Sequence, residues 1–332
     1  MKHISILVPE DAVLASITDP RYMFSVINEF LSAAGNPPMF HVQMVGLTSE
    51  VHLNRGVFTV HTDALLKDIK RTDLIIVPAL SGELKTAIEI NRKFIPWIIE
   101  QNRSGAEVAS LCLGAFLLAA TGLLDNKKCS THWSFTNEFR AMFPKVNLVD
   151  DKIITEEDGI YTSGGATSYW NLLLYLVEKF TNRETAILAS KYFVLEIDRR
   201  SQSPFTIFNG QKNHEDDTIK EAQEFIEENW SEKISVGDLA YKFAIGRRHF
   251  ERRFKKATNN TPVEYMQRVK IEAAKKSLEG GRKNVNEVMY EVGYSDTKAF
   301  RNVFKKVTGL SPVDYRNKYT RDIEWIHTRN NN

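Results

Sequence analysis

The sequence predicts an α/β domain with a mainly parallel sheet, followed by an all-helical domain. The first 195 residues alternate short β-rich runs with segments of helical periodicity. A polar stretch with Ser, Pro, Asn and Gly follows, and beyond it every strong pattern is helical. With 332 residues, 42% of them apolar, the chain is long enough to bury two separate cores.

The N-terminal part alternates four predicted strands with four predicted helices. The strands are Ile4–Val8, Phe40–Val45, Asp73–Val77 and Glu107–Leu111, and their apolar runs indicate burial on both faces. The helices are Tyr22–Ala34, Glu83–Asn102, Ala115–Leu124 and Ser168–Phe180. This alternation is typical of a parallel sheet covered by helices. We expect an N-terminal domain over 1–198, a linker over 199–217, a second domain over 218–320 and a tail over 321–332.

The last third of the chain contains an internal repeat. Segment 254–265 recurs 50 residues later at 304–315, with Phe, Lys-Lys, Thr, Pro-Val and Tyr in the same order. Upstream, Ser235-x-x-Asp238 matches Asn284-x-x-Glu287 with a spacing of 49, and both pairs have the pattern of a capping box. The one-residue difference should lie in the turn that follows. A repeated helix, short turn and helix predicts two helix-turn-helix units.

The second helix of each repeat has the composition of a DNA-reading helix. The first helices are predicted at Val236–Phe243 and Val285–Val292, the second at Arg247–Lys256 and Thr297–Lys306. Phenylalanines four residues apart (Phe250, Phe254, Phe300 and Phe304) mark the inner face. The outward residues expected to read bases are Arg248, Glu251, Arg252, Thr297, Lys298, Arg301 and Asn302. Those expected to contact phosphates are Arg247, Lys255, Lys256, Lys305 and Lys306.

The charge distribution supports a polyanionic partner for this region. Residues 241–320 contain 19 Lys and Arg against 8 Asp and Glu, a balance of +11, whereas the whole chain carries only +2. An ordinary solvated basic surface is the alternative that charge alone leaves open.

The N-terminus turns acidic too early for a secretory signal, no apolar run spans a bilayer, and Cys112 and Cys129 suit a reducing compartment. We expect a cytoplasmic protein without a membrane segment.

The C-terminal region resembles the AraC/XylS family of DNA-binding domains. The resemblance covers about 218–319 and is most specific at Val292-Gly293-Tyr294-Ser295-Asp296. It implies seven helices, two helix-turn-helix units joined by a long helix (about Val263–Glu279), and binding of double-stranded promoter DNA. The first unit departs from the family pattern, with Ala244 at the usual turn glycine and Gly246 at the usual Ser/Thr cap. A capping Gly costs only a few tenths of a kcal/mol.

The N-terminal part contains one motif with candidate chemistry, a strand that leads into Cys112 and then into small residues. This pattern is similar to a nucleophile elbow, and the helix N-terminus after it would favour a thiolate. His132 follows 20 residues later and could approach the sulfur. On composition alone, a buried, inert cysteine beside an unrelated histidine is the favoured interpretation.

This region resembles the ThiJ/PfpI superfamily, which has a flavodoxin-like, class I glutamine amidotransferase-like fold. The motifs are Cys112-Leu113-Gly114-Ala115, Ala120-Thr121-Gly122-Leu123-Leu124-Asp125, Thr131-His132-Trp133 and Thr162-Ser163-Gly164-Gly165. Together with the C-terminal region, the chain is similar to the GlxA family of transcriptional regulators, in which this domain senses a ligand and dimerises. In catalytic relatives a carboxylate approaches the cysteine, and Ser16 stands at that position here, while Glu10, Asp11 and Asp19 are out of phase.

We therefore expect a regulator without catalytic activity, metal or cofactor, in which Cys112, His132 and Ser16 line a vestigial pocket. Its expected partners are promoter DNA, an unidentified small-molecule effector and a second copy of the chain, with RNA polymerase as a further candidate. Two alternatives remain open at this point. One is a cysteine hydrolase or glyoxalase-type enzyme that also binds DNA, and the other is a redox sensor that uses Cys112 as a low-pKa thiolate, with Cys129 as its partner.

Overall fold

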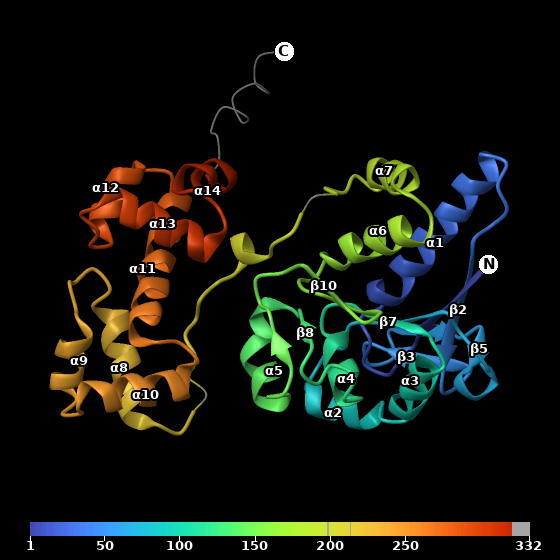
Figure 1. Cartoon of the computed structure of the whole chain (residues 1–332), viewed down its shortest axis with the longest axis horizontal. Helices are drawn as coiled ribbons and strands as arrows, with labels where there is room; N and C mark the ends of the chain where they lie inside the picture. The colour runs from blue at the N-terminus through green and yellow to red at the C-terminus, as the bar shows by residue number, and fades with distance from the viewer. Residues whose placement is uncertain (198, 213, 321–332) are drawn as a thin grey trace, which may run out of the picture. The chain divides into compact units, whose positions relative to one another are not determined.

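The computed structural model describes residues 1–197, 199–212 and 214–320. The chain divides into two compact units, Met1–Gln202 and Ser203–Asn332, and each is described by itself (Figure 1). The tail expected over 321–332 lies outside the described residues. Within the described part of the chain, no helix combines the length and apolar composition needed to cross a membrane.

Unit 1 is built on a seven-stranded sheet with the order β10-β11-β7-β6-β1-β2-β5. Neighbouring strands pair in parallel, except for the antiparallel pair of β10 and β11 at one edge. The strands are β1 (Lys2–Leu7), β2 (Phe40–Gly46), β5 (Ala64–Leu65), β6 (Leu74–Val77), β7 (Glu107–Ser110), β10 (Ile154–Glu157) and β11 (Ile160–Ser163). The predicted mainly parallel sheet is confirmed, and the four predicted strands correspond to β1, β2, β6 and β7.

Helices cover both faces of this sheet, which explains the apolar runs in its central strands. One face packs against α1 (Ala15–Ala33), α6 (Tyr169–Phe180) and α7 (Arg183–Tyr192). The other face packs against α2 (Leu84–Ile90), α3 (Phe94–Arg103), α4 (Gly114–Ala120) and α5 (Thr136–Met142). All four residues of β6 are buried, because this strand lies between the two helical layers.

Several elements of unit 1 differ from the sequence prediction. The predicted helix Glu83–Asn102 is two helices, α2 and α3, and the side chain of Asn91 between them donates hydrogen bonds to the carbonyls of Ala87 and Glu10. Helix α1 begins seven residues before the predicted Tyr22 and includes a proline. Three strands of the main sheet, β5, β10 and β11, were not predicted. Nor were the helices α5 and α7, the short strands β3 (Glu50–Leu53), β4 (Phe58–His61), β8 (Lys128–Cys129) and β9 (Asn147–Leu148), or the 3₁₀ turns η1 (Leu66–Asp68) and η2 (Trp133–Phe135).

The described part of unit 2 contains seven α-helices and the 3₁₀ turn η3 (Ser203–Phe205), so it is helical as predicted. The helices are α8 (Asp217–Glu228), α9 (Val236–Lys242), α10 (Arg247–Thr258), α11 (Pro262–Glu279), α12 (Val285–Glu291), α13 (Thr297–Thr308) and α14 (Pro312–Tyr319). Helix α11 contributes to two separate cores. Its first half packs with α8, α9 and α10, and its second half packs with α12, α13 and α14.

Candidate nucleic-acid interface and small-molecule site

The two repeats form the same local structure, a capped helix, a tight turn and a second helix. Ser235 and Asp238 form a complete capping box at α9, and Asn284 and Glu287 form one at α12. Each box satisfies two backbone N–H groups at the helix N-terminus. The two helix starts that the sequence pattern predicted are therefore set by side chains within the repeat itself.

The turns between the helices differ by one residue, and each depends on a left-handed backbone position. In the second repeat that position is Gly293, with φ of +77°, and in the first it is Ala244, with φ of 52°. An L-residue with a Cβ in this conformation costs roughly 1–2 kcal/mol. The first turn therefore keeps the helix-turn-helix geometry with strain that the second turn avoids.

The second helices, α10 and α13, are braced from behind by their phenylalanines. The four rings are fully buried, and each helix has one ring 5.2–5.4 Å from a tyrosine of the helix that follows: Phe254 on Tyr265, and Phe304 on Tyr315. Burial of an aromatic side chain is among the strongest single contributions to a small core. The inner face of each second helix is therefore fixed, and its opposite face is left to solvent.

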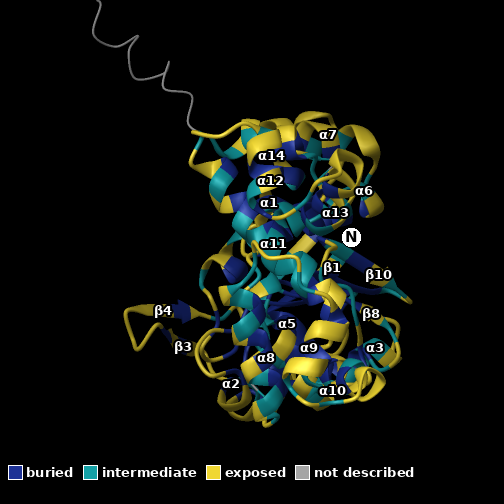
Figure 2. Ribbon diagram, turned by 90° about the vertical axis from the view of Figure 1, so that its left-hand side faces the viewer, coloured by how far each residue is buried: buried dark blue, intermediate teal, exposed yellow. Residues whose placement is uncertain are grey.

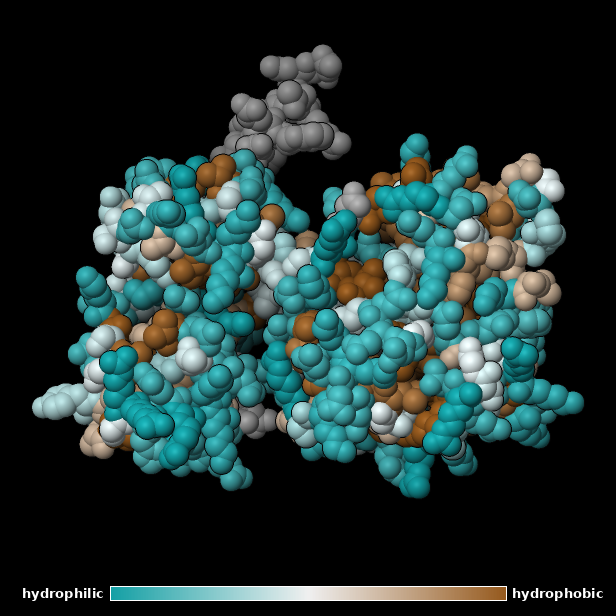
Figure 3. All heavy atoms as spheres, viewed as in Figure 1, coloured by the Kyte–Doolittle hydropathy of each residue, from teal (hydrophilic) through white to brown (hydrophobic). Residues whose placement is uncertain are grey.

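The outward face of α10 and α13 carries the residues that the sequence singled out. Of the twelve, all but Glu251 are exposed, and Figure 2 shows long exposed stretches on α9 and α10. The surface over the same helices is hydrophilic in Figure 3. The structure gathers the twelve residues on two faces of the same design, one on α10 and one on α13. They are Arg247, Arg248, Glu251, Arg252, Lys255 and Lys256 on α10, and Thr297, Lys298, Arg301, Asn302, Lys305 and Lys306 on α13.

The face of α10 is partly neutralised, whereas the described face of α13 has no acidic residue. Glu251 accepts a hydrogen bond from Arg247 at 3.1 Å, so these two side chains bind each other in the free protein. Their exposure makes this pair weak, and phosphate could displace it. Helix α13 also begins with a side-chain cap, because Asp296 accepts the N–H of Ala299, whereas Gly246 gives α10 none.

Two polar residues of α10, Arg253 and His249, were not singled out from the sequence. Arg253 points away from the exposed face and forms two hydrogen bonds to Asp216, which caps α8. This bidentate contact, together with the capped N–H of Ile219, holds the pKa of Asp216 below its usual range. Arg253 therefore ties α10 to α8. His249 is exposed on α10. Its position two residues after Arg247, at the start of the predicted second helix, was the signal that could have identified it.

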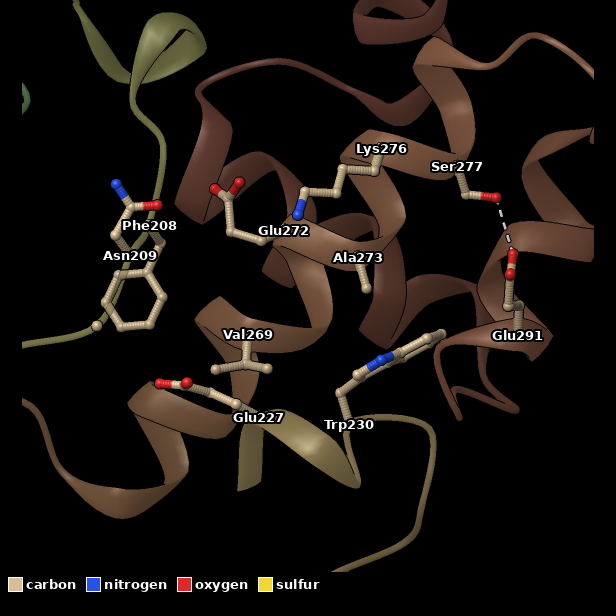
Figure 4. Close-up of a pocket in the computed structure, with 11 residues that line it drawn as sticks. Phe208, Asn209, Glu227, Trp230, Val269, Glu272, Ala273, Lys276, Ser277 and Glu291 are labelled. Carbon is tan, nitrogen blue, oxygen red and sulfur yellow. Dashed lines mark hydrogen bonds between the residues drawn. The ribbon is translucent and has the colours of Figure 1, made fainter. Parts of the chain in front are cut away.

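A cavity of about 670 Å³ lies beside α11, between the two halves of unit 2 (Figure 4). Trp230, Val269 and Ala273 form its apolar wall. Its carboxylates already have partners: Glu227 accepts from Tyr265 and pairs with Lys212, Glu272 pairs with Lys275, and Glu291 accepts from Ser277 and pairs with Lys283. The cavity was not predicted from the sequence.

In unit 1, Cys112 lies in a strained turn between β7 and α4, as the elbow motif predicted. Its φ of 52° is left-handed, and its side chain is 5% exposed. The N–H of Cys112 donates to Ser163 Oγ at 3.3 Å, and its carbonyl accepts from Thr131 Oγ1 at 3.1 Å. Three segments at the carboxyl edge of the sheet therefore meet at this cysteine.

The electrostatics of Cys112 favour the inert cysteine over the alternative of a stabilised thiolate. Burial raises the pKa of Cys112 to about 12, although the N–H of Leu113 acts in the opposite direction. Burial raises the pKa of Cys129 to about 12 as well. Desolvation of a charged sulfur outweighs the partial charge of the short helix α4, because no described cation compensates it. Both thiols are protonated at neutral pH, which weakens the redox-sensor alternative.

The other expected pocket residues take different roles. Ser16 is fully buried, donates to the carbonyl of Val13 at 2.6 Å and accepts the N–H of Ala79 at 2.9 Å, so its hydroxyl holds the start of α1. His132 caps the turn η2, where Nδ1 accepts from Ser134, and desolvation lowers the pKa of the ring.

Among the three carboxylates that the sequence placed out of phase, Asp19 does reach this region. Asp19 accepts a hydrogen bond from the Tyr169 hydroxyl at 2.7 Å. Burial, then Asp19, then the nearby Cys112 raise the pKa of Tyr169, so its hydroxyl keeps its proton. Asp19 lies one turn after Ser16 on α1, and only the fold shows that α6 places a tyrosine between it and the cysteine.

Comparison with known proteins agrees with this two-part architecture. Residues 21–179 match the DJ-1/PfpI family, and residues 239–318 match a helix-turn-helix domain. A crystal structure of a putative transcriptional regulator protein from Vibrio parahaemolyticus aligns with a TM-score of 0.52 and 23% identity, over 57% of this chain and 98% of that one. It supports the fold of the part that it covers.

Two curated relatives extend across both parts. The HTH-type transcriptional regulator GbdR of Pseudomonas aeruginosa is 26% identical over 258 residues, which is 76% of this chain and 68% of GbdR. The HTH-type transcriptional regulator GlxA of Rhizobium meliloti is 22% identical over 221 residues, which is 65% of this chain and 67% of GlxA. The chain thus combines a DJ-1/PfpI domain with an AraC-type helix-turn-helix domain, which is the architecture of the transcriptional regulators that it is similar to.

Proposed function

We propose that this regulator binds promoter DNA with α10 and α13 in the major groove and that a small ligand in unit 1 controls the binding. One observation carries the DNA contact: two exposed cationic helices, each braced by a buried pair of phenylalanines, flank a single connecting helix. Helix α11 has 18 residues, a length of about 27 Å at 1.5 Å per residue. That length suits two reading helices in successive turns of one duplex face, about 34 Å apart.

In this arrangement the side chains divide into base readers and phosphate contacts. Arg301 and Asn302 on α13, and Arg248 and Arg252 on α10, have the donors that recognise guanine and adenine edges. Lysines 255, 256, 305 and 306 near the helix C-termini contact phosphates. We expect the larger share of sequence selectivity from α13, because its cap is complete and no acidic side chain on it competes for its arginine.

Fluorescence anisotropy of the full chain with a labelled duplex tests this proposal. Binding should weaken steeply between low and moderate salt, with a log–log slope close to the number of phosphates contacted. The control is a double charge reversal in unit 1, Lys67→Glu with Lys70→Glu, because both side chains are exposed and belong to the other unit. A folded full chain that shows no attraction to any duplex at low ionic strength would overturn the proposal.

For unit 1 we propose a small-molecule effector site around Cys112 and His132 that does not perform catalysis. Three observations support the absence of turnover: Ser16 stands where a catalytic carboxylate is expected, Asp19 is bound to Tyr169, and the pKa of Cys112 is about 12. Neither a free carboxylate nor an activated thiol is then available to the site. Steady hydrolysis of an amide or conversion of a glyoxal by the purified protein, abolished in Cys112→Ala, would contradict this proposal.

We further propose that unit 1 mediates a homodimer, which places two DNA-binding domains across adjacent half-sites. Helix α7 and the residues after it expose Ile187, Leu188, Tyr192 and Val194, and Figure 3 shows apolar surface in this region. Covering such a face is a common role of a second subunit. Sedimentation of the wild type and of Leu188→Glu, with the exposed Ile90→Glu as control, distinguishes a dimer from a monomer. A regulator of promoter DNA would work in the cytoplasm.

A further inference from the structure

The last residues of unit 1 are paired with the body of that unit. The N–H of Ile153 donates to the carbonyl of Arg200 at 3.3 Å, and the N–H of Gln202 donates to the carbonyl of Asp151 at 3.0 Å. The Ser201 hydroxyl donates to the same carbonyl of Asp151 at 2.9 Å. The segment that leaves unit 1 toward the DNA-binding domain is thus held as a short antiparallel bridge.

The side chain of Gln202 reinforces this bridge from inside the fold. It is 1% exposed, and its Nε2 donates to the carbonyl of Thr131 at 3.0 Å and to that of Lys152 at 3.2 Å. Gly164 faces it, and a Cβ there would lie 2.4 Å from Nε2 and 2.8 Å from the Thr131 oxygen. The site is closely fitted around the glutamine.

The loops that hold Gln202 are the loops that hold Cys112. Thr131 accepts from Gln202 through its carbonyl and donates through its hydroxyl to the Cys112 carbonyl. Gly164 follows Ser163, whose hydroxyl accepts the Cys112 N–H. One residue, Thr131, therefore connects the turn at the proposed effector site to the outgoing chain.

Immediately after Gln202, the chain is fastened to both halves of the DNA-binding domain. The carbonyl of Pro204 accepts from Tyr319, and the carbonyl of Thr206 accepts from Lys275 at 2.6 Å, both in the second half. Four residues after Pro204, the ring of Phe208 packs on Tyr265 of the first half, with centroids 5.1 Å apart. Gln202, which is bonded within unit 1, and Pro204, which is bonded within unit 2, are therefore only two residues apart in the chain.

We propose that Gln202 is a latch through which the Cys112 site controls the helix-turn-helix domain. A ligand that moves the Thr131 loop removes one of the two acceptors of Gln202 Nε2, which weakens the hold on residues 200–202 and changes the constraint on segment 203–208. Hydrogen bonds to backbone carbonyls hold the latch, and each contributes about 1 kcal/mol, so the two states can differ by the few kcal/mol that ligand binding supplies. The inference rests on the proposed effector site, and its first test requires neither a ligand nor DNA.

Trypsin cleavage of the native full chain after Arg199 and Arg200 measures the open state of the latch. Cleavage follows the population of the locally open form when opening is fast. We expect Gln202→Ala to accelerate cleavage there about tenfold, since it removes two hydrogen bonds. Thr131→Val, which leaves Gln202 intact but cuts the bond to Cys112, should accelerate it about threefold.

The matched control is Gln101→Ala. Gln101 is also buried and bonded to backbone, at Thr72 and Lys70. These two residues precede β6, so Gln101 lies at the amino ends of the parallel strands and not at the carboxyl ends, where Cys112 lies. Its cleavage at Arg199 and Arg200 should equal that of the wild type. If Gln202→Ala fails to fold, Gln202→Glu keeps the size of the side chain and replaces the donor with an acceptor, and the same acceleration is expected.

Wild-type cleavage in both Gln202 variants would overturn the latch. Wild-type cleavage in Thr131→Val alongside accelerated cleavage in Gln202→Ala would overturn its coupling to the Cys112 turn. Coupling to DNA is measured with a duplex that the full chain selects from a random library. Gln202→Ala should change the affinity for this duplex at least threefold, and Gln101→Ala should not. Equal affinities of Gln202→Ala and the wild type would refute transmission from the latch to the DNA-binding domain. A wild-type chain that selects no duplex would overturn the proposed function while the cleavage result still decides the latch.

Discussion

The turn of the second helix-turn-helix unit should be intolerant of any side chain at Gly293. Its φ is +77°, and a Cβ built there would lie 2.6 Å from the Ser231 carbonyl oxygen and 2.8 Å from Lys270 Nζ. The left-handed conformation costs an L-residue roughly 1–2 kcal/mol. Displacing a backbone carbonyl in a packed structure adds about 1–3 kcal/mol to this destabilisation. Alanine also reduces the conformational entropy of the unfolded chain, which offsets up to about 1 kcal/mol. We expect Gly293→Ala to destabilise unit 2 by roughly 2–4 kcal/mol.

Gly237 provides the matched control for this prediction. It lies in the first turn of α9 with ordinary helical backbone, and a Cβ there would meet only Ser235 Oγ, at 3.5 Å. Gly237→Ala should therefore be neutral or stabilise unit 2 by up to about 1 kcal/mol. Native-state hydrogen exchange within the full chain measures both changes, at the α12 and α13 amides for Gly293→Ala and at the α9 and α10 amides for Gly237→Ala. Equal protection in Gly293→Ala and wild type would refute the geometry assigned to this turn.

Three further predictions concern the two candidate sites. Arg301→Ala and Arg252→Ala should each weaken binding to a selected operator by roughly 1–3 kcal/mol and relax selectivity at one position; selectivity unchanged in Arg301→Ala would contradict the placement of α13. Lys305→Ala should weaken binding to all duplexes about equally and flatten the salt dependence, as a salt titration with operator and random duplexes would show. Alkylation of Cys112 in the folded chain should be slow at pH 7 and accelerate only as pH rises toward the pKa of about 12; fast labelling at pH 7, followed by mass spectrometry, would contradict a buried thiol.

The raised thiol pKa also sets the direction of a pH effect on stability. A cysteine exposed by unfolding ionises near pH 9, whereas folded Cys112 ionises near 12. Below pH 9 the thiol is protonated in both the folded and the unfolded state, so its titration does not change the free energy of unfolding. As the pH rises from 9 to 12, only the unfolded state loses its proton, so stability should fall across that window. Cys112→Ser should reduce the fall, since serine does not titrate there.

Much of the fold could be predicted from the sequence because the relevant signals are local. The strands β1, β2, β6 and β7 are apolar runs, and the capping boxes of α9 and α12 are formed by side chains three residues apart. The break at Asn91 was missed because its cause is a contact with Glu10, distant in sequence. Helix α7 was missed because three of its five apolar residues, Ile187, Leu188 and Tyr192, face solvent and leave no clear periodicity.

The sequence by itself determined the class of each domain, the internal repeat and the outward position of the side chains proposed to contact DNA, because each depends on spacing within one element. The tertiary structure alone decided that burial keeps Cys112 protonated, that Arg247 pairs with Glu251, that Asp19 meets Tyr169, and that Gln202 closes on Thr131. Desolvation and long-range hydrogen bonds depend on which segments meet in space, and that information does not reside in any local pattern.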